Sequence, residues 1–233
     1  MAQVFRPRAN TIARASIAGV VIGVSVLGLV AAGVDRSPYV TNQGVVRDQP
    51  VPFSHEHHVN GLGIDCRYCH TSVGDSGFAG LPPTKTCMTC HSRIWTDAPL
   101  LAPVRDSWRE GVPLQWTRVH NLPDFVYFQH DIHVNKGIGC VTCHGPVDQM
   151  SLMFQQNALQ MKWCLDCHYS PEKHLRPREQ VFNMHFAIDD QIKREYSDAN
   201  HVVTDQESLG KALMDRYHIP TDGRLTSCYT CHR

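Results

Sequence analysis

The stretch Phe128-Gln129-His130-Asp131-Ile132-His133-Val134-Asn135, followed by Cys140-Val141-Thr142-Cys143-His144, decides how this chain folds. Its second part contains two cysteines three positions apart and a histidine directly after them. Two thiols at this spacing can each add to one vinyl group of a haem, and the next imidazole then lies under the iron as its proximal ligand. The stretch therefore predicts covalent attachment of a c-type haem.

The same pattern occurs five times and uses all ten cysteines. Paired cysteines also occur in zinc ribbons and redox thiol pairs, but a zinc site would not need a histidine after every pair. We therefore expect five covalently bound haems c. The predicted attachment residues are Cys66, Cys69, Cys87, Cys90, Cys140, Cys143, Cys164, Cys167, Cys228 and Cys231, and the predicted proximal iron ligands are His70, His91, His144, His168 and His232.

The motif Phe-x-His-x-x-His-Val-Asn occurs twice, at residues 53–60 and 128–135. Each copy is followed by two attachment motifs, so residues 53–91 and 128–168 are predicted to be two dihaem modules of similar design. Histidines three positions apart on a helical turn lie on one face and can reach two different haems. The predicted distal iron ligands are His55, His58, His130 and His133.

The fifth distal ligand has two candidates. Fifteen histidines, five of them proximal, leave more than enough imidazoles for five irons. We favour His120, and Met184 is the alternative, because a thioether ligand would raise the potential of one iron. With every iron six-coordinate the haems carry electrons and no iron is open to substrate, so no catalytic residue is predicted.

The amino-terminal segment has the composition of a membrane anchor. Residues 1–14 contain three arginines and no acid, and residues 15–34 contain no charge. About twenty helical residues cross a hydrocarbon core of about 30 Å, whereas the apolar part of a secretory signal usually has about 7–15. We expect a single transmembrane helix with a cytoplasmic amino terminus and the haem domain on the periplasmic or extracytoplasmic side. A cleaved signal peptide is the alternative, since residues 31–33 are small.

The rest of the chain gives little sign of strands. Residues 35–52 read as a linker, 92–127 as a connecting segment, and 169–233 as a carboxyl-terminal segment that ends in the fifth motif. The predicted fold is therefore mainly short α-helices and loops wrapped around haems, with the haems supplying most of the buried apolar surface. The formal net charge of zero favours neither nucleic acid nor an anionic surface as partner.

Three segments carry a family resemblance: 53–70, the run Val119 to Phe128 that leads to His130 and His133, and 161–168. These segments resemble the pentahaem cytochrome c subunit of bacterial alternative complex III. The similarity extends over nearly the whole chain, including the anchor. The dihaem module also looks like the class III multihaem cytochromes.

The resemblance implies a quinol-oxidising respiratory complex. Its partners would be an iron–sulfur subunit, a monohaem cytochrome and integral-membrane quinol-binding subunits. The chain would then be no enzyme by itself but the electron-transfer subunit that delivers electrons to a periplasmic acceptor.

Three other functions compete with this hypothesis. A self-sufficient membrane-bound multihaem quinol dehydrogenase would have four motifs, one of them just after the anchor, whereas here Cys66 lies well beyond Val34. A free-standing periplasmic electron-storage cytochrome would need the anchor removed. A catalytic multihaem reductase of the known pentahaem type would carry Cys-x-x-Cys-Lys, which does not occur.

Overall fold

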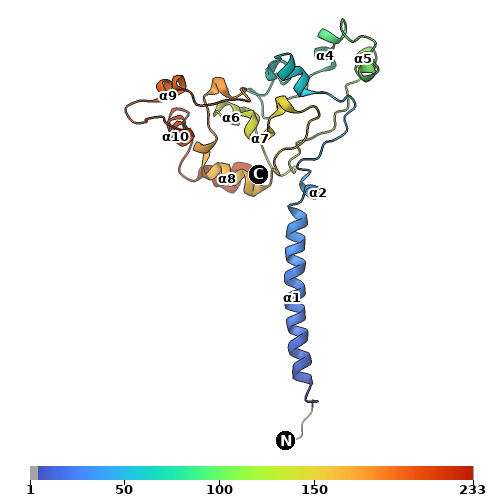
Figure 1. Ribbon diagram of the computed structural model, residues 1–233, viewed down its shortest axis with the longest axis vertical. Helices are drawn as coiled ribbons and strands as arrows, with labels where there is room; N and C mark the ends of the chain where they lie inside the picture. The colour runs from blue at the N-terminus through green and yellow to red at the C-terminus, as the bar shows by residue number, and fades with distance from the viewer. Residues whose placement is uncertain (1–4, 233) are drawn as a thin grey trace. The chain divides into compact units, whose positions relative to one another are not determined.

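The computed structural model describes residues 5–232, and Figure 1 shows the course of the chain. These residues form helices and loops without a β-strand, and two isolated antiparallel bridges join Val46 to Phe154 and Ile138 to Leu175. The chain divides into two compact units, one ending at Gln43 and the other beginning at Gly44. The predicted fold class is confirmed: a helical, loop-rich chain with one long apolar helix near its amino terminus.

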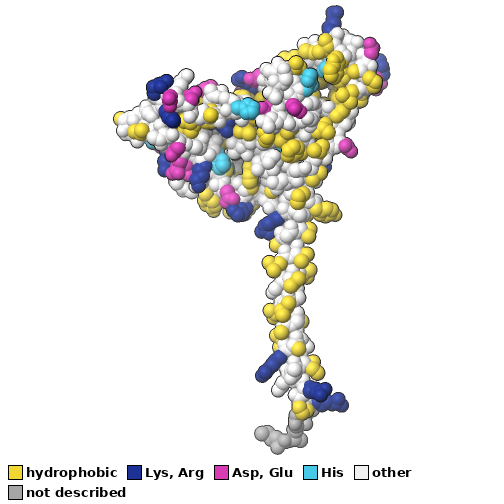
Figure 2. All heavy atoms as spheres, in the orientation of Figure 1, with side chains coloured by type: hydrophobic (Ala, Val, Ile, Leu, Met, Phe, Trp, Pro, Cys, Tyr) yellow, Lys and Arg dark blue, Asp and Glu magenta, His cyan; other side chains and the backbone are white. Residues whose placement is uncertain are grey.

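The first unit consists of α1 (Ala9–Asp35) and the short α2 (Pro38–Thr41). With 27 residues, α1 is about 40 Å long and contains the predicted span. Figure 2 shows mostly hydrophobic side chains along it. Its length and composition suffice to cross a membrane, which is compatible with a single-pass anchor; a signal sequence would have the same properties. The first four residues of the predicted cytoplasmic segment lie outside the described residues.

The second unit contains all five cysteine motifs, connected by loops. Its elements are a π-helix η1 (Glu56–Gly61), the α-helices α3 (Cys66–Cys69), α4 (Thr84–His91), α5 (Ala102–Glu110), α6 (His130–Asn135), α7 (Cys140–His144), α8 (Met161–Tyr169), α9 (Asp190–Tyr196), α10 (Gln206–Arg216) and α11 (Cys228–Cys231), and the 3₁₀ turns η2 (Pro99–Leu101), η3 (Val147–Gln149), η4 (Pro171–Lys173), η5 (Arg178–Gln180) and η6 (Arg224–Thr226).

Every cysteine motif lies in a helix, namely α3, α4, α7, α8 or α11. Residues three apart in a helical turn share a face, so each helix presents both of its thiols on one side. None of the residues in these five helices is buried by protein. The local fold thus displays each cysteine pair on an accessible helical face.

A conventional hydrophobic core lies in the carboxyl-terminal segment, which the sequence analysis did not predict. Leu209 and Leu213 of α10 are fully buried and belong to one cluster with Leu175 and with Ile192 and Tyr196 of α9. Residues 169–227 contain no cysteine motif, so these helices have to bury their apolar faces against one another. The expectation that haems supply most of the buried surface therefore does not extend to this segment.

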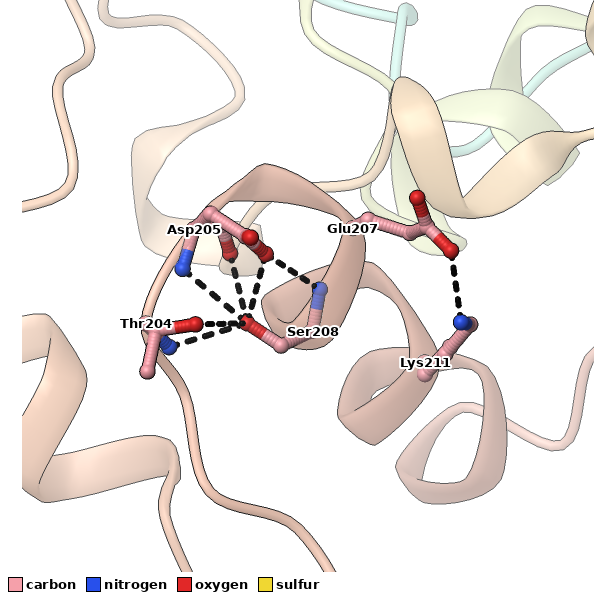
Figure 3. Close-up of polar contacts among 5 residues, drawn as sticks. All are labelled: Thr204, Asp205, Glu207, Ser208 and Lys211. Atoms are coloured by element: carbon pink, nitrogen blue, oxygen red, sulfur yellow. Dashed lines mark hydrogen bonds and ion pairs between the residues drawn. The ribbon is translucent and has the colours of Figure 1, made fainter.

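The amino terminus of α10 is fixed by a capping box (Figure 3). The Asp205 carboxylate accepts a hydrogen bond from the Ser208 backbone N–H at 2.9 Å, and the Ser208 hydroxyl accepts one from the Asp205 backbone N–H at 3.0 Å. This reciprocal arrangement satisfies N–H groups that a helix leaves without partners in its first turn. One turn further on, Lys211 pairs with Glu207.

We expect Gly210→Ala to destabilise the core around α10. A Cβ at this position would overlap the Glu172 carbonyl of η4, so the two elements would have to separate. Overpacking of this kind costs about 1–3 kcal/mol, and in a chain of this size each kcal/mol lowers the unfolding temperature by about 2–4 °C. Thermal unfolding followed by circular dichroism measures the effect. Gly74→Ala, where a Cβ meets nothing within 4 Å, is the control and should unfold like the wild type.

Candidate haem-binding sites

Four of the five predicted proximal histidines are oriented by a backbone carbonyl. Since a carbonyl only accepts hydrogen bonds, Nδ1 must carry the proton, which leaves the lone pair of Nε2 free for a metal. Ligating histidines in metalloproteins are held in this way. The donors and acceptors are His70 Nδ1 to Gly80 (2.8 Å), His168 Nδ1 to Leu225 (2.8 Å), His232 Nδ1 to Phe125 (3.2 Å) and His91 Nδ1 to Ile94 (3.4 Å).

Three of the predicted distal histidines are held in the same tautomer. His58 and His133 occupy equivalent places in the two repeats, and each donates through Nδ1 to the carbonyl four residues before it, at 2.8 Å. His130 donates through Nδ1 to the carbonyl of Gly77 at 3.1 Å. Gly77 lies in the first module. Seven of the ten predicted histidine ligands therefore present Nε2.

Three distal–proximal pairs of rings have the separation that a shared iron requires. Two imidazoles that bind one metal from opposite sides, each at about 2 Å, have ring centres about 6 Å apart, because each centre lies about 1 Å behind its nitrogen. The observed separations are 6.3 Å for His58 and His91, 6.2 Å for His133 and His168, and 6.2 Å for His130 and His144. The residues present thus fit haems with two histidine ligands.

The two modules agree in the pairing of the second histidine of the repeat. In each, the second histidine of the repeat pairs with the proximal histidine of the second attachment motif: His58 with His91, and His133 with His168. The sequence repeat predicted equivalent roles for His58 and His133, and their ring pairings are equivalent in the structure.

The phenylalanine that opens each repeat packs on both of its histidines. Phe128 stacks on His133, with ring centres 4.5 Å apart, and meets His130 edge-on at 4.8 Å. Phe53 does the same with His58 and His55, at 4.3 and 4.9 Å. The sequence analysis gave these residues no role, although their recurrence in the repeat was visible. Such contacts restrict the rotation of both imidazoles.

We expect Phe128→Ala to alter two haems without removing either. Both His130 and His133 would lose the ring that restricts them, so the axial imidazoles of two irons would become less well ordered. Electron paramagnetic resonance should show broadened low-spin signals for two haems, while the number of haems per chain stays the same. Phe128→Tyr keeps the ring and serves as the control; a spectrum for Phe128→Ala identical to wild type would contradict the assigned role.

His120 lies beside a predicted proximal ligand, His144, with ring centres 4.3 Å apart. Its Nε2 is buried and has no hydrogen-bond partner in the described structure. Burial, with a contribution from the charge of His130, lowers the pKa of His120 to about 4, so the ring is neutral at pH 7. The structure therefore brings His120, His130 and His144 together.

The Nδ1 atom of His55 is also buried and lacks a hydrogen-bond partner. Burial, followed by the charges of His70 and His58, lowers its pKa to about 4. Burial and the charge of His120 lower the pKa of His144 to about 3. Neutral imidazole is the form that binds a metal.

The remaining predicted ligand positions are less closely matched. Among residues 5–232 no other histidine ring contacts His232, whose ring neighbour is Phe125 at 5.7 Å. Met184 is half-buried on the loop after η5. The choice between His120 and Met184 as the fifth distal ligand stays a prediction.

The two thiols of the third motif do not resemble zinc ligands or redox thiols. Reactive thiols and metal ligands have lowered pKa values, but burial raises the pKa of Cys143 to about 12 and of Cys140 to about 11, with further contributions from neighbouring thiols. Within the described residues no three His, Cys, Asp or Glu side chains gather as a metal site. Cys90 and Cys228 are exposed and the other cysteines are half-buried.

Paired cysteines on helical faces and histidines that present Nε2 in pairs are the features expected of a multihaem c-type cytochrome. Sequence comparison supports the same class. Over 99 residues the chain is 38% identical to a protein of Nitratidesulfovibrio vulgaris (strain Hildenborough) named menaquinone reductase, multihaem cytochrome c subunit.

The aligned region comprises 42% of this chain and 46% of the relative, so the chain spans about half the length of the curated protein it matches. No family model matches the chain. The similarity supports a multihaem cytochrome c and covalently bound haem, and it does not single out the pentahaem subunit of alternative complex III.

Proposed function

We propose that this chain is a membrane-anchored relay that passes electrons through five c-type haems within a quinone-linked respiratory complex. The observation that carries the proposal is the set of three histidine pairs with ring centres 6.2–6.3 Å apart, each joining a histidine of an attachment helix to one of η1 or α6. Iron with two protein ligands has no position for substrate and is suited to electron transfer. The chain would therefore act as part of a complex and would not catalyse a reaction alone.

The chain's own residues would hold each haem in three ways. A cysteine pair fixes the porphyrin covalently, the adjacent histidine binds the iron from one side, and a distal histidine from another segment binds it from the other. The bound haem supplies one-electron chemistry, while backbone carbonyls such as those of Gly80 and Leu225 keep the ligands in the correct tautomer.

The particular complex we propose is alternative complex III, in which electrons leave quinol through an iron–sulfur subunit and pass to a monohaem cytochrome or another periplasmic acceptor. This rests on the family resemblance of residues 53–70, 119–133 and 161–168. The anchor α1 would hold the haem unit at the outer face of the membrane, beside integral-membrane subunits that bind quinol.

A second candidate is a complex that reduces menaquinone, so that electrons flow in the opposite direction. The name of the relative favours it. The two candidates share the relay and differ in the partners and in the direction of flow.

Gentle purification from membranes, with identification of the copurifying subunits, tests the proposal. We expect an iron–sulfur protein and integral-membrane subunits to accompany the chain, and all of its haems to be reduced by added quinol in the complex. A chain that purifies alone and is readily reduced by quinol would refute the relay and favour a self-sufficient dehydrogenase. Reduction of menaquinone by the complex, with no reduction of its haems by quinol, would select the second candidate.

A further inference from the structure

The histidine contacts define which haem sites adjoin one another. The haems are named first to fifth in the order of their motifs, which begin at Cys66, Cys87, Cys140, Cys164 and Cys228. Two sites adjoin when one short segment supplies or orients an imidazole for each of them.

The first repeat joins the first and second haems. The ring centre of His58 lies 6.3 Å from that of His91, the proximal ligand of the second haem. His55, one turn before it, is the counterpart of His130, which pairs with the proximal ligand of the first attachment motif in its own module. We therefore assign His55 to His70, the proximal ligand of the first haem. Phe53 packs on both His55 and His58, so the two imidazoles belong to one unit.

The loop 77–80 joins the first haem to the third. The carbonyl of Gly80 accepts the Nδ1–H of His70 at 2.8 Å, and that of Gly77 accepts the Nδ1–H of His130 at 3.1 Å. The His130 ring in turn lies 6.2 Å from His144, the proximal ligand of the third haem. Four consecutive residues thus orient one imidazole of each module.

The single turn of α6 joins the third haem to the fourth. His130 pairs with His144, and His133, three residues on, pairs with His168 of the fourth motif, each at 6.2 Å. This is the arrangement expected for histidines that share a helical face and serve neighbouring irons.

The turn η6 joins the fourth haem to the fifth. The carbonyl of Leu225 accepts the Nδ1–H of His168 at 2.8 Å, and the fifth motif begins three residues later at Cys228. The turn η6 accordingly lies against α8.

From these four junctions we propose that the haems form one unbranched row in the spatial order second, first, third, fourth, fifth. The two ends of the row are then the second and fifth haems, and these are the haems whose motifs contain the exposed cysteines Cys90 and Cys228. Electrons enter and leave the row at these ends. The inference rests on the proposed function, because it takes the paired histidines as iron ligands.

A structure of the haem-loaded full chain in detergent tests the order directly, since each haem is identified by its own cysteine pair. We expect the nearest iron of the fifth haem to be the fourth, and that of the second haem to be the first. Direct adjacency of the second haem to the third or fifth would overturn the order. Five haems in another order would leave the relay function intact, so the two failures are distinguishable.

A matched pair of variants tests the order in solution. His58→Gly opens the iron of the second haem and His133→Gly that of the fourth, and each open iron gives a high-spin signal in electron paramagnetic resonance. An end haem has one magnetic neighbour and the fourth haem has two. We expect the relaxation enhancement of the high-spin signal in His133→Gly to be roughly double that in His58→Gly. Equal enhancement, or a larger one in His58→Gly, would overturn the proposed row.

Discussion

Replacing both Cys140 and Cys143 by alanine is expected to remove one haem and to destabilise the whole haem-binding unit. The third motif lies in the middle of the proposed row, and burial raises the pKa of its thiols, to about 11 for Cys140 and about 12 for Cys143. The Nε2 atoms of His144 and of its partner His130 would then have no iron to bind. Each buried polar group left without a partner costs about 1–3 kcal/mol, and even one or two kcal/mol changes the ratio of folded to unfolded chain by a factor of about 5–30.

The haem content and the unfolding temperature measure this effect. The pyridine haemochrome assay should give four haems per chain, in a much smaller yield of folded protein. Cys228→Ala with Cys231→Ala is the matched control, because Cys228 is exposed and α11 has no buried residue. The control should also lose one haem but should unfold close to the wild-type temperature. Equal losses of stability in the two variants would contradict the central position of the third motif.

Replacing His58 by methionine is expected to raise the reduction potential of one haem and leave the other four near their original values. A thioether stabilises the reduced iron relative to a second imidazole, and axial ligands together set haem potentials over a range of about 0.8 V. We expect a rise on the order of 0.1 V for the haem attached at Cys87 and Cys90. A spectroscopic redox titration of the purified chain resolves it.

The neighbouring residue provides the control for this substitution. His57 has the same side chain but stacks on Trp95, with ring centres 6.0 Å apart, and has no counterpart in the second repeat, where Ile132 stands. His57→Met should therefore leave all five potentials unchanged. A shift in His57→Met, or none in His58→Met, would show that the ligands of the first repeat are wrongly assigned.

Much of this arrangement could be predicted from local spacing. The three-residue separation of the cysteines requires a helical turn, and α3, α7 and α11 consist of little else. The repeat of Phe-x-His-x-x-His predicted that His58 and His133 have equivalent roles, and their ring pairs are equivalent in the structure.

Contacts between distant segments could not be predicted in the same way. His120 reaches His144 because residues 111–129 form an irregular segment between α5 and α6, and no periodic pattern encodes its path. The carbonyls that fix the tautomers of His168 and His232 lie 57 and 107 residues away in sequence. Backbone carbonyls carry no residue-specific signal, so only the folded chain reveals which imidazole each one orients.

The hydrogen bond from His168 to Leu225 also bears on biogenesis. The chain leaves the ribosome or a translocation channel with its amino terminus first. His168 of the fourth motif therefore emerges 57 residues before Leu225, whose carbonyl orients it. Haem ligation to the fourth motif can begin on an unfinished chain, but the imidazole is locked only when the last residues arrive. Premature termination before Leu225 would therefore damage two cofactor sites and not one.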